Sequence, residues 1–291
     1  LRSIAVAVNR PSFLFNPTSC ASLSQESTLT STRAATQTLA SPFQADDCSG
    51  LRFKPALRLA SDAHTSKAKG AALKATLTQP AHQANIRSVV AQLPKQLPAR
   101  LTTLQKACPE ATYAANPHSC PSGAKVGSAT VTTPVLPGRL SGPAYLVSHG
   151  NEAFPDLDLL LEGDGVRVIL TATTRIARGV TTSDFSSIPD VPVSSFTLTL
   201  PQGPNSALAA NGSLCKGRLT MPTTITAQNG LQLKRSSRLA VAHCPRRHSR
   251  HSRRNVRARS CRRHHRCPHR RPRARRPPAR RSRQEATRSA P

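Results

Sequence analysis

Hydrophobic and polar residues alternate in short segments spread over the first 244 positions of the chain. A period of two residues is typical of a β-strand that buries one face. The segments are separated by turn residues, and the 25 prolines and 14 glycines disfavour long helices. The pattern therefore predicts an all-β protein. The clearest alternations are Ile4, Val6 and Val8; Leu73, Ala75 and Leu77; Val166, Val168 and Leu170; and Phe196, Leu198 and Leu200.

One turn sequence is specific enough to predict a hairpin. The run Glu-Gly-Asp-Gly at 162–165 lies between the apolar segments 157–161 and 166–170. An Asp-Gly pair between two strands favours the tight turns of β-hairpins. The best helical stretch, residues 100–107, is long enough for one or two turns only.

A motif recurs with a period near 100 residues. The sequences N-P-T-S-C, N-P-H-S-C and N-G-S-L-C end at Cys20, Cys120 and Cys215. A second alignment places 41–55 over 142–156. Short strands in units of this size are typical of β-sandwiches. We therefore expect tandem Ig-like β-sandwich repeat units stapled by disulfides: the C-terminal part of a truncated unit at 1–48, and complete units at 49–149 and 150–244.

The cysteines fit these units. Eight cysteines, an even number, lie mostly beside turn residues, which favours disulfides and an oxidising compartment. The first and last units each hold a cysteine pair after the Asn motif, and in the middle unit His149 stands where the second cysteine is expected. The expected bridges are Cys20–Cys48, Cys108–Cys120 and Cys215–Cys244. We expect a protein that is secreted, extracellular or associated with the cell wall.

Residues 245–291 differ sharply from the rest. They hold 19 arginines against one acid, Glu285, and thus +18 of the net charge of +29, with no aromatic side chain. Such a segment cannot bury enough apolar surface to offset the entropy of ordering, so we expect a disordered basic tail. A shifted reading frame in a GC-rich gene is the alternative origin of this composition. The paired arginines are Arg246, Arg247, Arg253, Arg254, Arg262, Arg263, Arg270, Arg271, Arg275, Arg276, Arg280 and Arg281.

The charge of the tail predicts attraction to polyanions. For a secreted protein these are anionic cell-wall polymers or lipid headgroups, and nonspecific nucleic-acid binding in vitro follows from the same charge. The tail also holds Cys261, His264, His265, Cys267 and His269, whose spacing resembles a zinc site. The surrounding arginines would repel a divalent cation, so a local Cys261–Cys267 disulfide or free thiols are expected instead.

Catalytic patterns are absent from the sequence. It contains no nucleophile elbow, zinc-protease helix, phosphate-binding glycine loop or EF-hand loop. Ser148 and His149 are adjacent, so on a strand they point to opposite faces and cannot act as a pair. We expect no enzymatic activity, no cofactor and no metal.

One acidic cluster leaves an alternative open. Asp156, Asp158, Glu162 and Asp164 surround the predicted hairpin and offer oxygen ligands of the kind that Ca²⁺ prefers. The other interpretation is a solvated strand face, because alternation places three of these acids opposite the leucines.

Four sequence features together resemble a known class of proteins. They are Asn-Pro-x-Ser-Cys, the Leu-Pro pairs at 93–94 and 200–201, L-T-T-L-Q-K-A-C-P at 101–109 and P-D-V-P-V-S-S-F at 189–196. The set is similar to very large secreted repeat proteins of soil actinobacteria that have no assigned activity, over about residues 1–244. The resemblance implies a surface or wall-associated location and brings no catalytic residues.

These observations favour a non-catalytic structural stalk or adhesive protein whose tail associates with the anionic envelope. The alternatives are an extracellular ligand- or glycan-binding module and a non-catalytic part of a larger secreted hydrolase. No run of 18 apolar residues occurs, so no transmembrane segment is expected.

Overall fold

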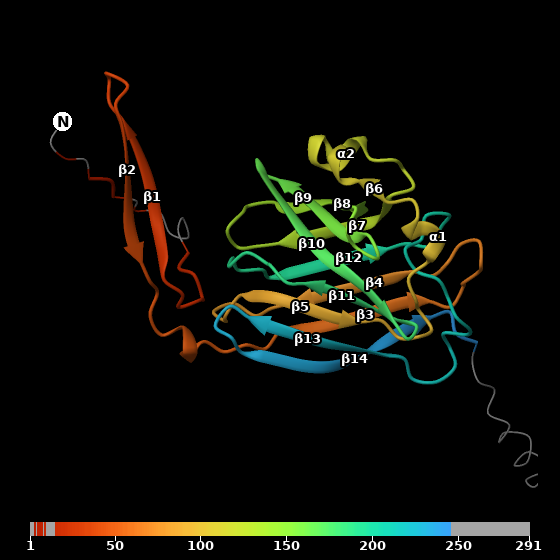
Figure 1. Cartoon of the computed structure of the whole chain (residues 1–291). Coiled ribbons are helices and arrows are strands. Elements are labelled where there is room, and N and C mark those ends of the chain that lie inside the picture. Colours follow the sequence, from red (N-terminus) through yellow and green to blue (C-terminus); the bar gives the residue numbers. More distant parts are fainter. Residues whose placement is uncertain (1–2, 4, 8, 10–14, 246–291) are drawn as a thin grey trace, which may run out of the picture. The chain divides into compact units, whose positions relative to one another are not determined.

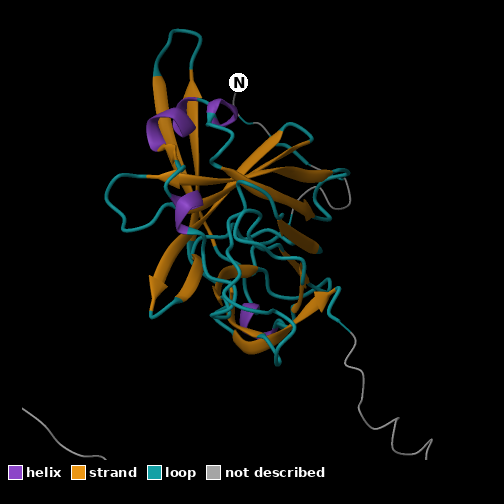
Figure 2. Ribbon diagram, turned by 90° about the vertical axis from the view of Figure 1, so that its right-hand side faces the viewer, coloured by secondary structure: helices purple, strands orange, loops and turns teal. Residues whose placement is uncertain are grey.

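The computed structural model describes residues 15–245 together with 3, 5–7 and 9, and it is nearly all β. Of the predicted strand at Ile4 to Val8, only residues 5–7 are described, and they are not in a strand. Ile4, Val8 and residues 246–291 of the basic tail lie outside this part of the chain. Helices are short and peripheral (Figure 2). The strands are β1 (Leu23–Thr30), β2 (Thr36–Phe43), β3 (Ala56–Asp62), β4 (Leu73–Thr78), β5 (Ile86–Gln92), β6 (Cys108–Pro109), β7 (Lys125–Thr132), β8 (Arg139–Ser148), β9 (Asp156–Gly163), β10 (Val166–Ala177), β11 (Val180–Phe185), β12 (Ser195–Leu200), β13 (Thr220–Ala227) and β14 (Gln232–Ala242).

Eleven of these strands close into a barrel (Figure 1). Their order is β8-β7-β12-β4-β3-β14-β13-β5-β11-β10-β9, and β9 pairs again with β8. The short strand β6 pairs with β8 alone and is not part of the ring. The ring leaves its eleven strands with no free edge, which removes the sites at which strands add to one another.

An odd number of strands cannot close with antiparallel pairs alone, because the last strand would run in the same direction as the first. The barrel resolves this with one parallel pair, β14 beside β3, in which Leu239 is opposite Leu59 and Ala242 opposite Asp62. All other pairs of the ring are antiparallel. The parallel pair joins the first and last strands of the barrel.

The local predictions within the described residues are confirmed. The alternations at 73–77, 166–170 and 196–200 lie in β4, β10 and β12. The predicted hairpin is β9–β10, where Asp164 and Gly165 adopt φ values of 49° and 76°. Two successive positive φ values define the tight turn that an Asp-Gly pair favours. The single helical turn is α1 (Leu101–Leu104).

The predicted division into tandem sandwiches is wrong. Its boundary after residue 149 falls between β8 and β9, which pair with each other. Strands of the two supposed units also alternate around the ring: β12 lies between β4 and β7, and β5 lies between β11 and β13. Alternation identifies strands but not their partners, so 49–149 and 150–244 form one barrel instead of two sandwiches.

Three disulfides are present, at Cys20–Cys48, Cys108–Cys120 and Cys215–Cys244. These are the pairs expected from the sequence. The first and third each enclose a complete antiparallel hairpin, β1–β2 and β13–β14. Disulfides of this kind persist in oxidising compartments.

The sequence did not reveal a small structure that covers the outside of β8 and β9. It consists of β6, α2 (Glu110–Ala115) and a 3-10 turn (Pro117–Ser119), and the Cys108–Cys120 bridge closes it. Asn116 caps the 3-10 turn by accepting a hydrogen bond from the His118 backbone N–H. Tyr113 of α2 packs edge-on against Tyr145 of β8, with ring centroids 5.9 Å apart.

The strands β1 and β2 form a two-stranded ribbon of their own (Figure 1). All of their residues are exposed. The base of the ribbon is held by Asp190, whose carboxylate accepts hydrogen bonds from Thr18 and from the Ser19 backbone N–H. The Cys20–Cys48 bridge closes the ribbon just beyond this point.

The close approach of β8 to β9 gives a test of ring closure. A Cβ added at Gly142 would clash with the backbone oxygen of Leu160. Because that oxygen belongs to the paired strand and cannot move freely, Gly142→Ala should lower the free energy of unfolding by about 1 to 3 kcal/mol. Chemical denaturation measures the change. Gly50→Ala is the control, since no atom lies within 4 Å of the added Cβ there; equal effects of both variants would contradict the packing of β8 on β9.

Candidate ligand-binding cavity

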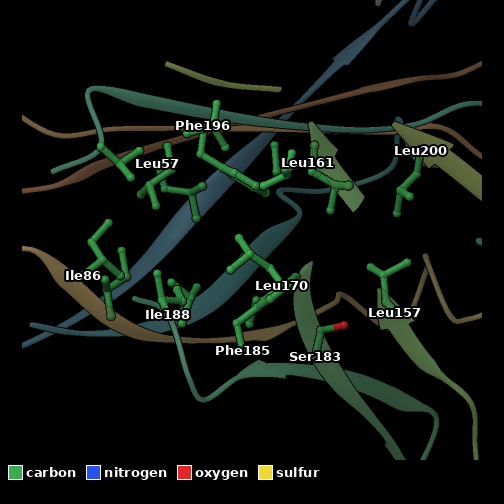
Figure 3. Close-up of a pocket in the computed structure, with 18 of the residues that line it drawn as sticks. Leu57, Ile86, Leu157, Leu161, Leu170, Ser183, Phe185, Ile188, Phe196 and Leu200 are labelled. Atoms are coloured by element: carbon green, nitrogen blue, oxygen red, sulfur yellow. The ribbon is translucent and has the colours of Figure 1, made fainter. Parts of the chain in front are cut away.

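The barrel encloses a cavity of about 440 Å³. Its walls come from the inward positions of the strands, and no charged side chain lies among them. Figure 3 shows Phe196 and Leu161 on one wall facing Leu170 and Phe185 on the other. Eight strands give a barrel whose interior side chains nearly fill it, and the interior widens as strands are added. Eleven strands lined by leucine, valine and alanine leave space at the centre.

One end of the barrel is sealed by the connections after β5 and β12. Ser206 is buried there, and its hydroxyl donates to the Ala71 carbonyl at 2.8 Å, while Thr103 donates to the Ser206 carbonyl at 2.8 Å. Leu97 and Leu208 are buried in the same connections. These hydrogen bonds satisfy the backbone of the buried loops, so this end is part of the core.

The opposite end carries exposed apolar residues. Val191, in the connection from β11 to β12, is 43% exposed and Val166, at the start of β10, is 37% exposed, and both line the cavity. Val135 and Leu136, in the connection from β7 to β8, are half-buried lining residues at the same end. This end is therefore the mouth of the cavity.

Hydroxyl groups are the polar atoms of the lining side chains, and several already have partners in the protein. Thr133 donates to the Pro192 carbonyl at 2.6 Å, and Thr181 accepts from the Ala99 backbone N–H at 3.0 Å. Ser183 lies among the apolar residues of one wall (Figure 3). The cavity thus suits an apolar molecule with at most a neutral polar group.

The acidic cluster considered for Ca²⁺ does not converge. Glu162 pairs with Arg167 at 2.7 Å, and Asp164 accepts a hydrogen bond from the Gly138 backbone N–H at 2.8 Å. Asp156 accepts from the Thr174 backbone N–H at 3.3 Å. Three of the four carboxylates therefore have partners of their own, and among the described residues the four do not form a group of converging ligands.

The solvated strand face is wrong as well, because Asp158 is only 2% exposed. The small structure around α2 covers this face of β9. Burial raises the pKa of Asp158, and its Oδ1 has no hydrogen-bond partner among the described residues. The nearby Tyr113 hydroxyl is also buried without a partner, and burial raises the pKa of that phenol.

His149 lies beside this region and contacts carboxylates. Its Nδ1 is 3.2 Å from Glu110 Oε1, and its Nε2 is 3.9 Å from Asp156 Oδ2. Burial lowers the pKa of His149, but the hydrogen bond to Glu110 and the surrounding negative charge outweigh it and raise the pKa overall. Within the described part of the chain no side-chain hydrogen bond joins Ser148 to His149.

One group of potential metal ligands lies at the barrel's parallel strand pair. In the described residues Asp62, His64 and His243 present ligand atoms within 4.8 Å of one another. Asp62 accepts from His243 Nδ1 at 2.7 Å and contacts His64 Nδ1 at 2.9 Å. The three groups therefore satisfy one another, and they link the ends of β3 and β14.

The tail predictions fall outside the described residues. They comprise the twelve paired arginines, the zinc-like cluster and the Cys261–Cys267 alternative. Across residues 15–245, no helix is long and apolar enough to cross a membrane.

Comparisons with protein-family models, with curated proteins and with solved structures returned no match to the chain.

The burial of Asp158 predicts a pH-dependent stability difference. Because burial raises the pKa of Asp158, the folded protein binds the carboxyl proton more tightly than the unfolded chain does. The resulting contribution to folding stability is present at low pH. It is lost as the pH rises from the unfolded-state pKa near 3.8 through the raised folded-state pKa. Asp158→Asn cannot ionise, so the variant should melt a few degrees above the wild type at pH 7, since about 1 kcal/mol shifts Tm by 2 to 4 °C in a domain of this size. The gap should shrink towards pH 4.

Thermal melts at both pH values measure this gap. The exposed Asp46 gives the control Asp46→Asn, which should leave Tm unchanged at either pH. A gap for Asp158→Asn that is the same at pH 4 and pH 7 would contradict a buried carboxylate.

Proposed function

We propose that this protein is a non-catalytic extracellular binding module that holds a small, uncharged, apolar molecule inside the barrel. The observation that carries the proposal is the cavity of about 440 Å³ with no charged side chain in its walls. This volume lies in the range of small-molecule sites, which are mostly apolar with a few polar groups. The three disulfides support an oxidising, extracellular setting.

The energetic cost of an empty cavity favours an occupant. Side-chain atoms that line unfilled apolar space lack van der Waals partners on that side, which is unfavourable. An apolar ligand restores the lost contacts.

The lining also defines what is excluded. A carboxylate or ammonium group inside would lose its hydration without an opposite charge to compensate. A glycan would leave its many hydroxyls without partners, and the chain has no Trp on which a sugar ring would stack. A lipid-like alcohol, ketone or hydrocarbon fits these walls better than a sugar or a fatty acid anion.

Filling the cavity from inside should abolish binding without disturbing the outer surface. Ala91 of β5 lines the cavity, and Gln92 is its exposed neighbour on the same strand. Ala91→Phe should weaken binding of the uncharged dye N-phenyl-1-naphthylamine at least tenfold, because the ring occupies the ligand volume. Gln92→Phe adds the same ring outside the barrel and should bind normally.

Dye fluorescence and competition measure the effect, with circular dichroism showing that both variants fold. Dodecanol should displace the dye more effectively than dodecanoate at high salt, where general attraction to the basic chain is screened. Equal binding by the two phenylalanine variants would overturn the proposal.

The structural or adhesive role remains a second proposal, supported by the charge of the tail. Nineteen arginines and one acid in residues 245–291 favour association with wall polymers or lipid headgroups. In this proposal the tail retains the binding module at the anionic envelope.

Deleting residues 246–291 should abolish most salt-sensitive adsorption while leaving Tm within about 1 °C. In the intact protein, salt near 1 M shortens the Debye length to about 3 Å and should release it. Co-sedimentation with purified envelopes and with anionic lipid vesicles measures the adsorption. Undiminished binding of the shortened chain would contradict this role for the tail.

A further inference from the structure

The β1–β2 ribbon repeats the β13–β14 hairpin at a constant offset. Thr30 pairs with Thr36 in the ribbon, and Thr226 pairs with Gln232 in the barrel, so each partner is displaced by 196 positions. At the opposite end of the ribbon Leu23 pairs with Phe43. Adding the same offset of 196 to these two positions gives 219 and 239. The Leu239 backbone N–H donates to the Leu219 carbonyl there. The two hairpins have the same register along their full length.

The turns agree at the same offset. In the ribbon the Ser31 N–H donates to the Ala35 carbonyl at 2.8 Å, and in the barrel the Ala227 N–H donates to the Leu231 carbonyl at 2.8 Å. Ordinary hairpin turns vary in length and type, so a shared five-residue turn with the same closing bond indicates a structural repeat.

Left-handed backbone conformations recur at the equivalent positions. Ala34 has a φ of 61° and Gly230 a φ of 87°, while Asp47 and His243 both have a φ of 57°. Non-glycine residues rarely adopt positive φ. The last two lie immediately before the second cysteine of each hairpin, and the bridges span 28 and 29 positions. Register, turn and disulfide therefore identify residues 20–48 and 215–244 as two copies of one element.

The two copies differ in what surrounds them. In the barrel, β13 pairs with β5 and β14 pairs with β3. Among the described residues, β1 and β2 pair only with each other. Ile225 is 3% exposed and its equivalent Leu29 is 56% exposed; Leu239 is 5% exposed and its equivalent Phe43 is 46% exposed.

The ribbon keeps the apolar face that the barrel buries. The register places Leu23 opposite Phe43 and Leu39 opposite Ser27, so that one face holds the ribbon's four large apolar side chains, Leu23, Leu29, Leu39 and Phe43. We refer to these four residues as the ribbon face. A two-stranded hairpin with an exposed apolar face and two open edges is only marginally stable by itself.

We propose that the β1–β2 ribbon is the closing hairpin of a second barrel of the same kind. Its partner is a strand array with the pattern of β3 to β12 that lacks a hairpin of its own. Such an array has two free strand edges separated by the width of one hairpin, with which β1 and β2 could pair. Its apolar interior would cover the ribbon face. The barrel of this chain cannot accept the ribbon, because β13 and β14 fill the equivalent place. The inference does not depend on a ligand in the cavity.

An extended chain tests the proposal. A second copy of residues 49–214 is fused directly before Cys20 in a chain that continues to residue 291. The junction is placed there because residue 214 directly precedes Cys215, the equivalent of Cys20. The added segment should fold as a barrel closed by β1 and β2. Hydrogen exchange should then be as slow in β1 and β2 as in β13 and β14, whereas in the chain of 291 residues the ribbon should exchange at least 100-fold faster. An added segment that stays unfolded beside a fast-exchanging ribbon would overturn the proposal.

Two variants on opposite faces of β1 provide the matched control. Leu29→Glu places a charge on the ribbon face and should abolish the slow exchange of the ribbon and of the added segment. In the chain of 291 residues the same change should leave Tm unaltered, since the side chain is exposed there. Thr28→Glu changes the other face and should be tolerated in both chains. Equal loss of protection with both variants would overturn the assignment of the ribbon face.

A second copy of the chain is the competing occupant. Sedimentation velocity of the 291-residue protein should show a monomer at micromolar concentration. A dimer that Leu29→Glu dissociates would identify the second copy as the partner and overturn the proposal.

Discussion

The parallel pairing of β14 with β3 is the constraint on which the barrel depends. It joins the first and last strands of the ring, whose paired residues Leu59 and Leu239 are separated by most of the described chain. Closing so long a loop is entropically costly, and the contacts at the joint must offset that cost. The backbone bond from Ala63 to the Ala242 carbonyl and the Asp62–His243 contact extend the joint past the ends of both strands. Without this pair the sheet would have two open edges and its inner face would be exposed to water.

Closure of the ring explains why hydrophobic and polar residues alternate along the strands. Inward positions of strands that are far apart in the sequence face one enclosed volume, so strands with one apolar face together generate one apolar interior. Because the chain has few aromatic residues, leucine, valine and alanine line that interior, and a ring of this circumference is too wide for them to fill. The cavity is therefore a consequence of strand number and side-chain size. The sealed end, built around Ser206, leaves entry from the end that carries Val166 and Val191.

Features set by neighbours in sequence could be predicted, and features set by distant pairing could not. The Asp164–Gly165 turn, the strands beginning at Leu73, Val166 and Ser195, and the three disulfides rest on local residue types and motif spacing. The division into sandwiches failed because alternation does not say which strand pairs with which. The burial of Asp158 could not be predicted for a related reason. It is covered by α2, and a helix of six residues is too short to show a recognisable helical periodicity in the sequence. The cavity residues could in part be recognised in the sequence, because the inward positions of successive strands carry no charge. That these positions line one volume follows only from the closure of the barrel.

The repeated motif acquires a structural explanation from the two disulfide-closed hairpins. A period near 100 residues was inferred from three Asn motifs, and each of their cysteines does precede an antiparallel hairpin: β1–β2, β7–β8 and β13–β14. The first and third copies agree in register and turn at an offset of 196, about twice the inferred period, whereas β7–β8 lacks the bridge across its base. The bridge restricts the unfolded hairpin and, in the chain-entropy model, contributes roughly 3 kcal/mol or more. That contribution matters most for β13–β14, because this hairpin must pair with both β3 and β5. A hairpin already held in register by its own disulfide closes the ring with less loss of entropy than two free strands would.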